Sequence, residues 1–331
     1  FLLPAPAAAE SLESLASRDL PSSFEAALGT AQLPEVPSAG TGAPVYTKLS
    51  LGNGLNIYFV NVFQGDAEFI ELPNGKTALI DAGPAPDPKS KYTTPIVSNF
   101  LTKHGVKKID YLVLTHPHAD HYGGMPYVFD NLEVDSFYDS GVNNTSASGD
   151  ELVRGKAAQE PSCSVSRPAE GDSLSWAPGV EVKVLSTCPS SAKAADFGPQ
   201  AGNFPNDCSI VLKISYQGSS VLLTGDAGFN VENRLIATYG GGLKSDILKV
   251  GHHGSAYSTS AAFLKAVQPK TAYIEVGRNT FGHPTTSTLA RLADAGVPVL
   301  RTDRDGTQEV ALGGASAQAA PSVAMQPPSG D

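Results

Sequence analysis

The chain has 331 residues, of which 41% are hydrophobic and 17% are charged, a composition typical of globular proteins. This length allows a large buried core, in one large domain or two small ones. A formal net charge of −10 at pH 7 argues against non-specific adhesion to nucleic acid or anionic membranes. No run of about 18 apolar residues predicts a membrane-spanning helix.

The first residues have the composition of a processed export signal. The apolar stretch FLLPAPAAAE ends in small residues at Ala7, Ala8 and Ala9, as at the cleavage site of a signal peptide. We therefore expect a secreted or periplasmic protein. Residues 1–44 are rich in Ala, Ser and Pro, which predicts a signal remnant and a flexible N-terminal segment.

Residues 45–313 have the periodicity of a folded α/β domain. Strand-like runs alternate with helical segments, and an Asn-Gly pair at 74–75 marks a hairpin turn. Two successive strand-rich halves, each closed by helices, predict two sheets packed face to face with helices outside. The expected strands lie at 55–62, 67–72, 77–83, 109–116, 180–186, 208–216, 219–226, 246–250, 271–277 and 298–302, and the expected helices at 94–105, 230–239, 259–267 and 286–296.

Two segments differ from this pattern. Residues 141–179 are polar and rich in Ser, which predicts a long surface insert in the domain. Residues 314–331 are rich in Ala and Ser and predict a disordered tail.

Three cysteines allow two interpretations. Cys163 and Cys188 lie in a polar, Ser- and Pro-rich region, where a disulfide would hold a weakly packed insert and leave Cys208 unpaired. Three unpaired thiols in a reducing compartment are the alternative.

The strongest chemical signal lies at the end of the expected strand 109–116. The stretch LTHPHADHYGG places His116, His118 and His121 beside Asp120. Because strand side chains alternate, His116 and His118 project to one side, and the following turn brings the other two residues close. Imidazole and carboxylate groups suit zinc and other first-row metals, so this segment predicts ligands for two neighbouring ions.

Two ions require more ligands than one segment supplies. Asp226 ends the expected strand 219–226, and His252 and His253 follow the strand 246–250, so each lies where a strand stops. A carboxylate has two oxygens and can bridge two cations, which makes Asp226 the predicted bridging ligand.

The metal-binding motif belongs to a series of motifs that runs through the chain. IDAG precedes it, and TGD and a late histidine follow it; VFQGDAEFI, NDCSIVLKI, DILKVGHHGSAYSTSAAFL, VGRNTFGHP and LRTDRDGT complete the series. This pattern resembles the metallo-β-lactamase superfamily, and within it the hydrolase domain of ComEC competence proteins and its secreted stand-alone relatives. The resemblance covers about Leu55 to Leu312 and implies a four-layered αββα sandwich of two mixed β-sheets.

The resemblance also implies two divalent ions, Zn²⁺ or Mn²⁺, at one edge of the sheets. Asp81 of IDAG would orient a ligand from behind, since a metal-bound histidine donates its other N–H to a carboxylate or carbonyl. The implied ligands are His116, His118 and Asp226 for the first ion, and Asp120, His121, Asp226 and one histidine of GHHGS for the second.

Two positions depart from the superfamily pattern or leave it open. Many members carry a third histidine ligand to the first ion, and this chain has no histidine between His121 and His252. Asn206 or Asp207 of NFPNDCS would offer oxygen instead, a donor that suits manganese. Strand-end geometry favours His252 as the ligand from GHHGS and leaves His253 near the substrate, as a phosphate contact or proton donor.

The pattern brings two more polar residues toward the site. His283 in FGHP could contact a substrate oxyanion or protonate a leaving group, and Ser255 in GHHGS could donate a hydrogen bond. A structural cap or turn is the alternative role of each.

Together these features predict a hydrolase that uses a hydroxide activated by two metal ions. Asp120, beside that water, would accept or steer its proton. The ComEC-like resemblance implies a phosphodiesterase or nuclease, so a phosphoester, and first of all nucleic acid, is the expected substrate; the net charge of −10 argues against a processive nuclease with a basic groove. The alternatives are a carboxylic ester, lactone or β-lactam hydrolase, and a non-catalytic surface-binding protein. We expect a monomer by default.

Overall fold

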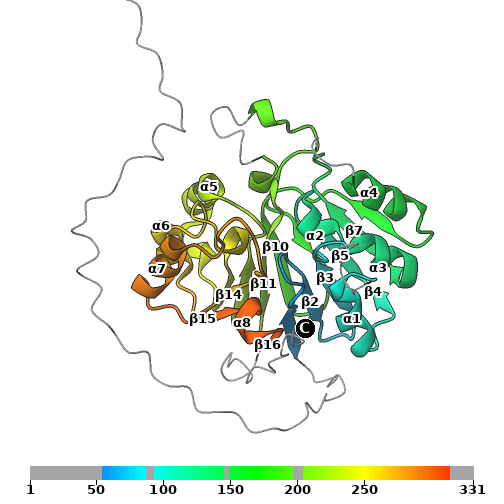
Figure 1. Cartoon of the computed structure of the whole chain (residues 1–331), viewed down its shortest axis with the longest axis horizontal. Coiled ribbons are helices and arrows are strands. Elements are labelled where there is room, and N and C mark those ends of the chain that lie inside the picture. The colour runs from blue at the N-terminus through cyan, green and yellow to red at the C-terminus, as the bar shows by residue number, and fades with distance from the viewer. Residues whose placement is uncertain (1–53, 87–92, 145–148, 197–203, 314–331) are drawn as a thin grey trace, which may run out of the picture. The chain divides into compact units, whose positions relative to one another are not determined.

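Two seven-stranded β-sheets lie face to face in the computed structural model, and helices cover their outer sides (Figure 1). The segments 1–44 and 314–331, expected to be a flexible N-terminal segment and a tail, lie outside the described residues. Within the described part, no helix combines the length and the hydropathy needed to cross a bilayer. The described residues are 54–86, 93–144, 149–196 and 204–313, all within one compact unit, 46–331.

The first sheet has the order β16-β1-β2-β3-β5-β7-β8 and combines two kinds of pairing. Neighbours from β16 to β3 are antiparallel, and neighbours from β3 to β8 are parallel. β16, which the sequence did not predict, pairs with β1 in the register Leu55↔Leu312 to Phe59↔Gln308. The strands are β1 (Leu55–Phe59), β2 (Glu68–Glu71), β3 (Thr77–Ile80), β5 (Tyr111–Leu114), β7 (Ser136–Asp139), β8 (Ser164–Ser166) and β16 (Gln308–Leu312).

The second sheet repeats this arrangement in the order β15-β14-β13-β12-β11-β10-β9. Its antiparallel half runs from β9 to β12, and its parallel half runs from β12 to β15. A short additional pair of strands is formed by β4 (Lys108–Ile109) and β6 (Glu133–Val134). The strands of the second sheet are β9 (Ser173–Leu174), β10 (Val180–Ser186), β11 (Val211–Tyr216), β12 (Ser219–Leu223), β13 (Ile247–Lys249), β14 (Thr271–Ile274) and β15 (Val299–Arg301).

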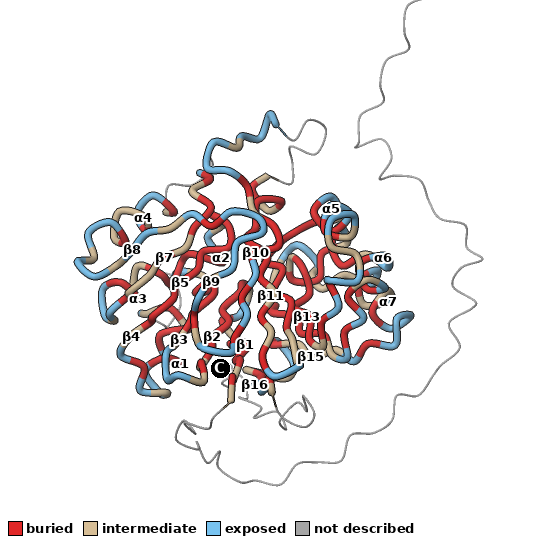
Figure 2. Tube along the Cα trace, turned by 180° about the vertical axis from the view of Figure 1, so that it is seen from behind, coloured by how far each residue is buried: buried red, intermediate tan, exposed pale blue. Residues whose placement is uncertain are grey.

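The central core lies between the sheets, where both contribute apolar side chains to one cluster. β10 shows the pattern that produces it, because Val180, Val182 and Val184 are buried and the residues between them are exposed. Phe59 of β1 and Tyr273 of β14 stack across the interface with ring centroids 4.2 Å apart, a contact worth about 0.5–1.5 kcal/mol beyond its buried area. Figure 2 shows the buried strands inside and the exposed outer faces of the helices.

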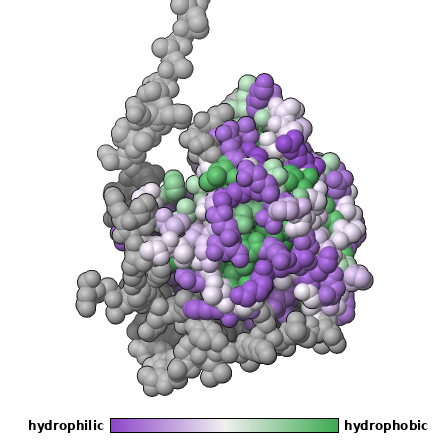
Figure 3. Space-filling model, turned by 90° about the vertical axis from the view of Figure 1, so that its right-hand side faces the viewer, coloured by the Kyte–Doolittle hydropathy of each residue, from purple (hydrophilic) through white to green (hydrophobic). Residues whose placement is uncertain are grey.

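Helices form the two outer layers. α1, α3 and α4 pack on the first sheet, and α5, α6 and α7 pack on the second, each over its own apolar cluster. The outer face at α3 and α4 is largely hydrophilic (Figure 3). The expected sandwich of two mixed sheets with helices outside is therefore confirmed. The helices are α1 (Ile96–Lys103), α2 (Ala119–Tyr122), α3 (Met125–Asn131), α4 (Gly149–Gln159), α5 (Phe229–Tyr239), α6 (Ala261–Val267), α7 (Thr286–Asp294) and α8 (Thr302–Asp305), with 3₁₀ turns at η4 (Asn206–Cys208), η5 (Gly240–Leu243) and η6 (Gly251–Gly254).

The segment 141–179 differs from the surface insert expected from its polar composition. It contains α4 and the strands β8 and β9, which extend the first and second sheets at their edges. Val153 of α4 and Trp176 are buried, and Trp176 stacks on Tyr111 of β5. The segment is thus part of the sandwich, because a few apolar residues among many polar ones are sufficient to anchor it.

The disulfide prediction was wrong in its pairing. Cys188 is bonded to Cys208, with the two Cα atoms 4.9 Å apart, and Cys163 is the free cysteine. Both bonded cysteines are buried beside Val142. The bond therefore joins the end of β10 to the turn η4, rather than stapling the segment 141–179.

The parallel strands bring the chemically interesting loops to one edge. β3, β5, β12, β13 and β14 all have parallel neighbours, so the residues that follow them emerge together at their carboxyl ends. The loop between β1 and β2 reaches the same edge, since the amide of Asp66 donates to the carbonyl of Asp120 at 3.3 Å. Gly65 makes this approach possible, because a Cβ at this position would lie 2.2 Å from that carbonyl oxygen.

Candidate metal centre

One carboxylate oxygen lies in the middle of four imidazole rings. Oδ2 of Asp226 is 3.4 Å from Nε2 of His121, 3.6 Å from Nε2 of His252, 3.6 Å from Nε2 of His253 and 3.7 Å from Nε2 of His116. Asp226 follows β12 directly, and its amide is fixed by a 3.0 Å hydrogen bond to Oγ of Ser209 in the described structure. Four ring nitrogens around one acidic oxygen form a concentrated set of metal ligands.

The H-x-H-x-D-H segment supplies half of this set. His116 follows β5 and is fully buried, and Nε2 of its ring lies 2.9 Å from Nδ1 of His118. Helix α2 begins at Ala119 and turns the chain back, so Asp120 and His121 face the same region. The local sequence therefore brings two pairs of candidate ligands to the region around Asp226.

The ligand atoms form two overlapping groups. His116, His121 and Asp226 make one buried group, and Asp120, His121 and His253 make another. Within the second group, Nε2 of His253 is 3.3 Å from Oδ2 of Asp120. This arrangement is consistent with a dinuclear metal site.

Hydrogen bonds at the far side of the rings show that the histidines fit metal ions. Nδ1 of His121 donates to Oδ2 of Asp81 at 2.6 Å, and Nδ1 of His253 donates to the carbonyl of Glu275 at 2.9 Å, as the network assigns the protons. Nε2 of each ring is buried and makes no hydrogen bond within the described residues. Once its proton is displaced, a nitrogen in this situation directs a lone pair into the site, as a metal ligand must.

Asp81 lies behind the ligands, where the resemblance placed it. Its carboxylate also accepts hydrogen bonds from Thr115, at 2.9 Å from the amide and 2.6 Å from the hydroxyl. The backbone of Asp81 has φ of 55°, a left-handed conformation that is costly for a residue with a side chain. We attribute this conformation to the need to aim the carboxylate at His121.

The electrostatic environment divides the histidines into two classes. Burial lowers the pKa of His116, His118 and His252, so these rings are neutral at pH 7 without a cation. Burial also opposes protonation of His253, but the carboxylates of Asp226 and Asp66 more than offset it and raise its pKa to about 10. The pKa of His121 is raised for the same reason, chiefly by Asp226. A divalent ion would displace these two protons.

Comparison with known proteins agrees with this geometry. The family model described as "Metallo-beta-lactamase superfamily" matches residues 60–174 and 195–277. The chain belongs to this superfamily. The matched region contains the H-x-H-x-D-H segment, Asp226 and both histidines of GHHGS.

Curated members of the superfamily place the chain near competence proteins. It is 32% identical over 260 residues to ComE operon protein 3 of Bacillus subtilis. The aligned region covers 75% of this chain and 32% of that protein. It is 33% identical over 214 residues to competence protein ComA of Neisseria gonorrhoeae, covering 64% of this chain and 27% of that protein. The chain therefore spans about a third of the length of these relatives, and the expected ComEC-like relationship is confirmed for that part.

A solved structure of similar architecture supports the fold. CmlA, a diiron β-hydroxylase from Streptomyces venezuelae, superposes with a TM-score of 0.52 and 15% identity, covering 78% of this chain and 54% of that one. At this identity the similarity is one of architecture. Family membership and the buried His/Asp groups together identify a metal-dependent hydrolase of the metallo-β-lactamase superfamily.

The two histidines of GHHGS both reach the metal centre of this superfamily member. Their backbones are left-handed, with φ of 49° at His252 and 51° at His253, which turns both rings toward Asp226. The side chain of His253 is 2% exposed and contacts Asp120, whereas that of His252 is 31% exposed. The structure thus differs from the expectation that His253 lies outside the ligand set, because the kink at η6 presents two successive side chains to one point.

Asp207 does not face the metallo-β-lactamase site, contrary to the expectation that it could be a ligand. Its carboxylate accepts from the amide of Gly228 at 3.3 Å and from the side chain of Asn230 at 3.3 Å, at the start of α5. In the neighbouring Asn206, the other candidate, Nδ2 lies 3.3 Å from Nδ1 of His252, and Oδ1 is buried and finds no hydrogen-bond partner among the residues that the structure describes. Asn206 is therefore the residue of NFPNDCS that approaches the ligands.

His283 and Ser255 have different roles in this superfamily member. The ring of His283 lies 5.2 Å from that of His252, and burial lowers the pKa of His283 to about 4, so it is neutral at pH 7. Ser255 is buried in a turn, where its Oγ accepts from the amide of Tyr257 at 3.3 Å. His283 can thus meet a substrate, while Ser255 has the structural role that was its alternative.

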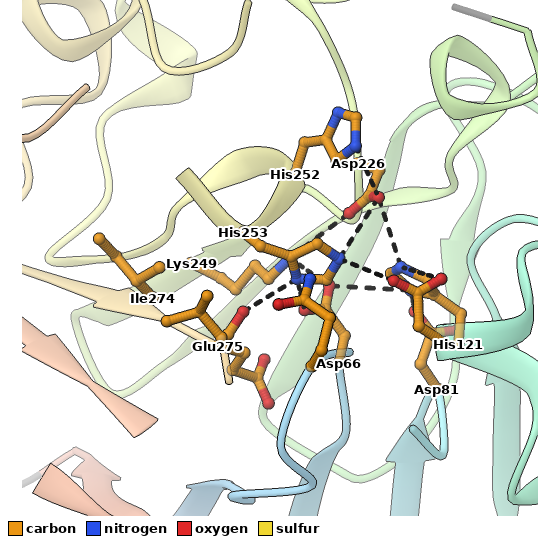
Figure 4. A network of polar contacts seen from close by, with 12 residues as sticks. Asp66, Asp81, His121, Asp226, Lys249, His252, His253, Ile274 and Glu275 are labelled. Carbon is orange, nitrogen blue, oxygen red and sulfur yellow. Dashed lines mark hydrogen bonds and ion pairs between the residues drawn. The ribbon is translucent and has the colours of Figure 1, made fainter. Parts of the chain in front are cut away.

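Sequence reasoning missed the charged residues beneath the metal centre. Lys249 is the last residue of β13, Glu68 begins β2, and Asp66 and Glu275 lie beside strands β2 and β14. All four side chains are buried, and Figure 4 shows Asp66, Lys249 and Glu275 around His253. The available signal was a charged residue within an otherwise apolar strand motif, as in DILKV and TAYIEVG.

Proposed function

We propose that this metal-dependent hydrolase is a phosphodiesterase that works with two divalent ions, Zn²⁺ or Mn²⁺. The observation that carries the proposal is the position of Oδ2 of Asp226, 3.4 to 3.7 Å from four ring nitrogens. A carboxylate in this position suits a bridge between two cations. Two bound ions would supply a nucleophilic hydroxide at neutral pH and stabilise the charge of an in-line displacement at phosphorus.

The side chains divide naturally between two ions. Asp226 is common to both sets. The proposed ligands are His116, His118 and His252 for one ion, and Asp120, His121 and His253 for the other.

Asp120 and His283 can act on the water and the substrate. The pKa of Asp120 is lowered below its ordinary value, since its histidine neighbours outweigh the effect of burial, so it is anionic at pH 7. One of its oxygens contacts His253, and its side chain is 31% exposed, so it can accept a proton from an attacking water. Neutral His283 can hydrogen-bond to an oxygen of the phosphoester.

Nucleic acid is the first substrate to test. The similarity to competence proteins supports it, and the net charge of −10 favours short or locally held substrates over long tracts of backbone. Hydrolysis of a carboxylic ester, lactone or β-lactam is the alternative within the same fold, and the absence of a histidine between His121 and His252 argues against a β-lactamase.

The experiment compares three reporter substrates. Purified protein would be mixed with bis-p-nitrophenyl phosphate, a p-nitrophenyl carboxylic ester or nitrocefin, with Zn²⁺, Mn²⁺ or a chelator. We expect turnover of the phosphodiester with metal and none with the chelator. Turnover of only the ester or nitrocefin would replace the proposal by the alternative, and binding of metal without hydrolysis of any reporter would indicate a non-catalytic protein.

We also propose that the protein functions outside the reducing cytoplasm. The Cys188–Cys208 disulfide supports this, because such bonds persist in oxidising compartments. Alkylation of the protein under denaturing, non-reducing conditions is expected to label Cys163 alone, and labelling of three thiols in protein taken directly from its cells would contradict the proposal.

A further inference from the structure

A layer of buried ionisable side chains lies directly beneath the metal centre. Lys249 and Asp66 are 0% exposed, Glu275 is 0% exposed and Glu68 is 1% exposed. They come from both sheets, since β2 belongs to the first and β13 and β14 to the second. Oxygen atoms of Asp66, Glu68 and Glu275 lie within 4.8 Å of one another, close enough to hold a cation.

Lys249 places its ammonium group among these carboxylates. Nζ forms an ion pair with Oδ2 of Asp66, donates to the carbonyl of Gly225 at 3.1 Å and lies 4.0 Å from Oδ1 of Asp226. The two oxygens of Asp226 thus have different neighbours. Oδ1 lies toward the ammonium group of Lys249, and Oδ2 faces the four imidazoles, where a metal ion would bind. The carboxylate of Asp226 therefore lies between the ammonium group and the four histidines.

Asp66 connects the lysine to a second ligand. Its Oδ1 is 3.1 Å from Nδ1 of His253, and its Oδ2 is the partner of Lys249 (Figure 4). The carbonyl of Glu275 accepts the Nδ1 proton and so directs Nε2 to a metal, and the carboxylate of Asp66 adds a negative charge beside that side of the ring. Lys249 can therefore act on His253 through Asp66, and on the site between the four histidines through Asp226.

We propose that Lys249 is a tethered cation that, paired with Asp66, sets the affinity of the centre for divalent ions. This inference rests on the proposed metal-dependent function. The ammonium repels cations bound at Asp226, and Asp66 reduces that repulsion while it orients His253. Neither side chain is a metal ligand in this arrangement, and both are positioning residues. A pocket without the lysine would bind divalent ions more tightly, and a pocket with the lysine but without Asp66 would bind them more weakly. The pair keeps the affinity between these two values.

The proposal predicts effects of opposite sign at two neighbouring residues. Lys249→Met removes the positive charge with little change in volume, so the affinity for Zn²⁺ or Mn²⁺ should rise about tenfold or more while the metal-free protein becomes less stable. Asp66→Asn leaves the lysine without its counter-charge and removes the negative charge beside Nδ1 of His253, so the affinity should fall about 10- to 100-fold, the range for residues that support ligands. The double variant should recover much of the affinity lost in Asp66→Asn.

The measurements are competition for each metal against a chromophoric chelator and thermal unfolding with and without metal. The matched control is the exposed ion pair of Asp130 and Lys156, changed to Asn and Met singly and together, which should leave metal affinity unchanged. Affinity changes of the same sign at Lys249 and Asp66, or loss of stability without any change in affinity, would overturn the proposal. If Lys249→Met does not fold, the proposal is tested by comparing Asp66→Asn with the double variant. Failure of the double variant to regain metal affinity would then overturn the proposal.

Failure here is distinguishable from failure of the proposed function. A wild-type protein that binds metal but hydrolyses no phosphodiester would refute the proposed activity, while opposite shifts in affinity would still support the role of Lys249. Phosphodiester turnover combined with shifts of the same sign would refute the role of Lys249 alone.

Discussion

The carboxylate of Asp226 has its two oxygens in different surroundings, with four imidazoles at Oδ2 and Lys249 at Oδ1. The amide in Asp226→Asn would have nearly the same shape without the negative charge. The negative charge attracts cations to four imidazoles that are either neutral or can lose a proton to a metal. We therefore expect this variant to lose metal and at least about 99% of activity. This loss corresponds to about 2.7 kcal/mol of transition-state stabilisation.

Elemental analysis of bound metal and a phosphodiester assay check this prediction together. His118→Ala should have the same effect on both quantities. The matched control is Asp130→Asn, an exposed aspartate on α3. Unchanged metal content in both site variants would contradict the ligand assignment.

Glu275 gives the protein a dependence on pH that is separate from catalysis. Burial, reinforced by the charge of Asp66, raises its pKa from 4.5 to about 8. The folded state then binds a proton at this group that the unfolded state releases, so the free energy of unfolding should fall as pH rises through this window. In the wild type, the amide of Ala67 donates to Oε1 of Glu275 at 3.0 Å. Glu275→Gln keeps an oxygen that can accept this hydrogen bond and removes the titratable carboxyl group.

Urea unfolding of the chelated protein at pH 5, 7 and 9 tests this expectation. Wild type should lose stability toward pH 9, and Glu275→Gln should lose less. Glu309→Gln, at the exposed face of β16, is the control. Parallel pH profiles for wild type and Glu275→Gln would show that this carboxyl is not the source of the dependence.

At the level of elements, the turn η4 and helix α5 are joined by Asp207. Its carboxylate accepts from the amide of Gly228 and the side chain of Asn230 where α5 begins. Asp207→Ala leaves that buried amide without its acceptor, so the free energy of unfolding should fall by about 1–3 kcal/mol. Metal content should stay unchanged, since these hydrogen bonds hold the carboxylate at the start of α5 and Asp207 belongs to none of the candidate ligand groups among the described residues.

Chemical denaturation followed by metal analysis of the folded variant checks both parts of this prediction. Asp196→Ala, at an exposed position, is the control. Loss of metal from Asp207→Ala at full stability would restore Asp207 as a ligand.

The regular elements were predictable because their apolar periodicity is strong. The strand expected at 109–116 is observed at Tyr111–Leu114, and the helix expected at 94–105 is observed at Ile96–Lys103. The strands from β6 to β9 and the final strand β16 were missed. β6 to β9 are only two to four residues long, too short for their alternation to stand out, and the pairing of β8, β9 and β16 is decided by a sheet edge that other parts of the chain build.

The candidate ligands could be selected from the sequence for a similar reason, and the buried residues beneath them could not. His116, His118 and His121 cluster in sequence, whereas Asp66 and Lys249 are separated by most of the domain. A lysine in a short strand ordinarily faces water, and only the opposite sheet, with Asp66 on its loop, makes burial of Lys249 favourable. The pairing of Cys188 with Cys208 likewise depends on the packing of both cysteines beside Val142, which composition does not reveal.

At the level of the whole molecule, metal binding should stabilise the fold. The ligands come from loops of both sheets, so an ion that binds only the folded state should raise the free energy of unfolding by about 2.7 kcal/mol at a concentration 100 times its Kd. Trp176 is the only tryptophan of the chain, is 1% exposed and stacks on Tyr111 with centroids 5.2 Å apart. Its emission therefore reports unfolding of the sandwich.

Thermal unfolding followed by tryptophan emission, with and without Zn²⁺ or Mn²⁺, measures this effect. The midpoint should rise with metal in wild type and stay constant in Asp226→Asn. An equal rise in both proteins would mean that the ions stabilise the fold at another site.

The pairing of β16 with β1 has a consequence for the order in which the protein can be assembled. Leu55 and Leu312 are direct partners in the first sheet, although 257 positions separate them in the chain. During synthesis, β1 leaves the ribosome long before its outer neighbour exists, and its outer edge has no partner strand until the last residues of the domain emerge. Closing so long a loop is slow. Folding of the first sheet is therefore completed only after every metal ligand has been made.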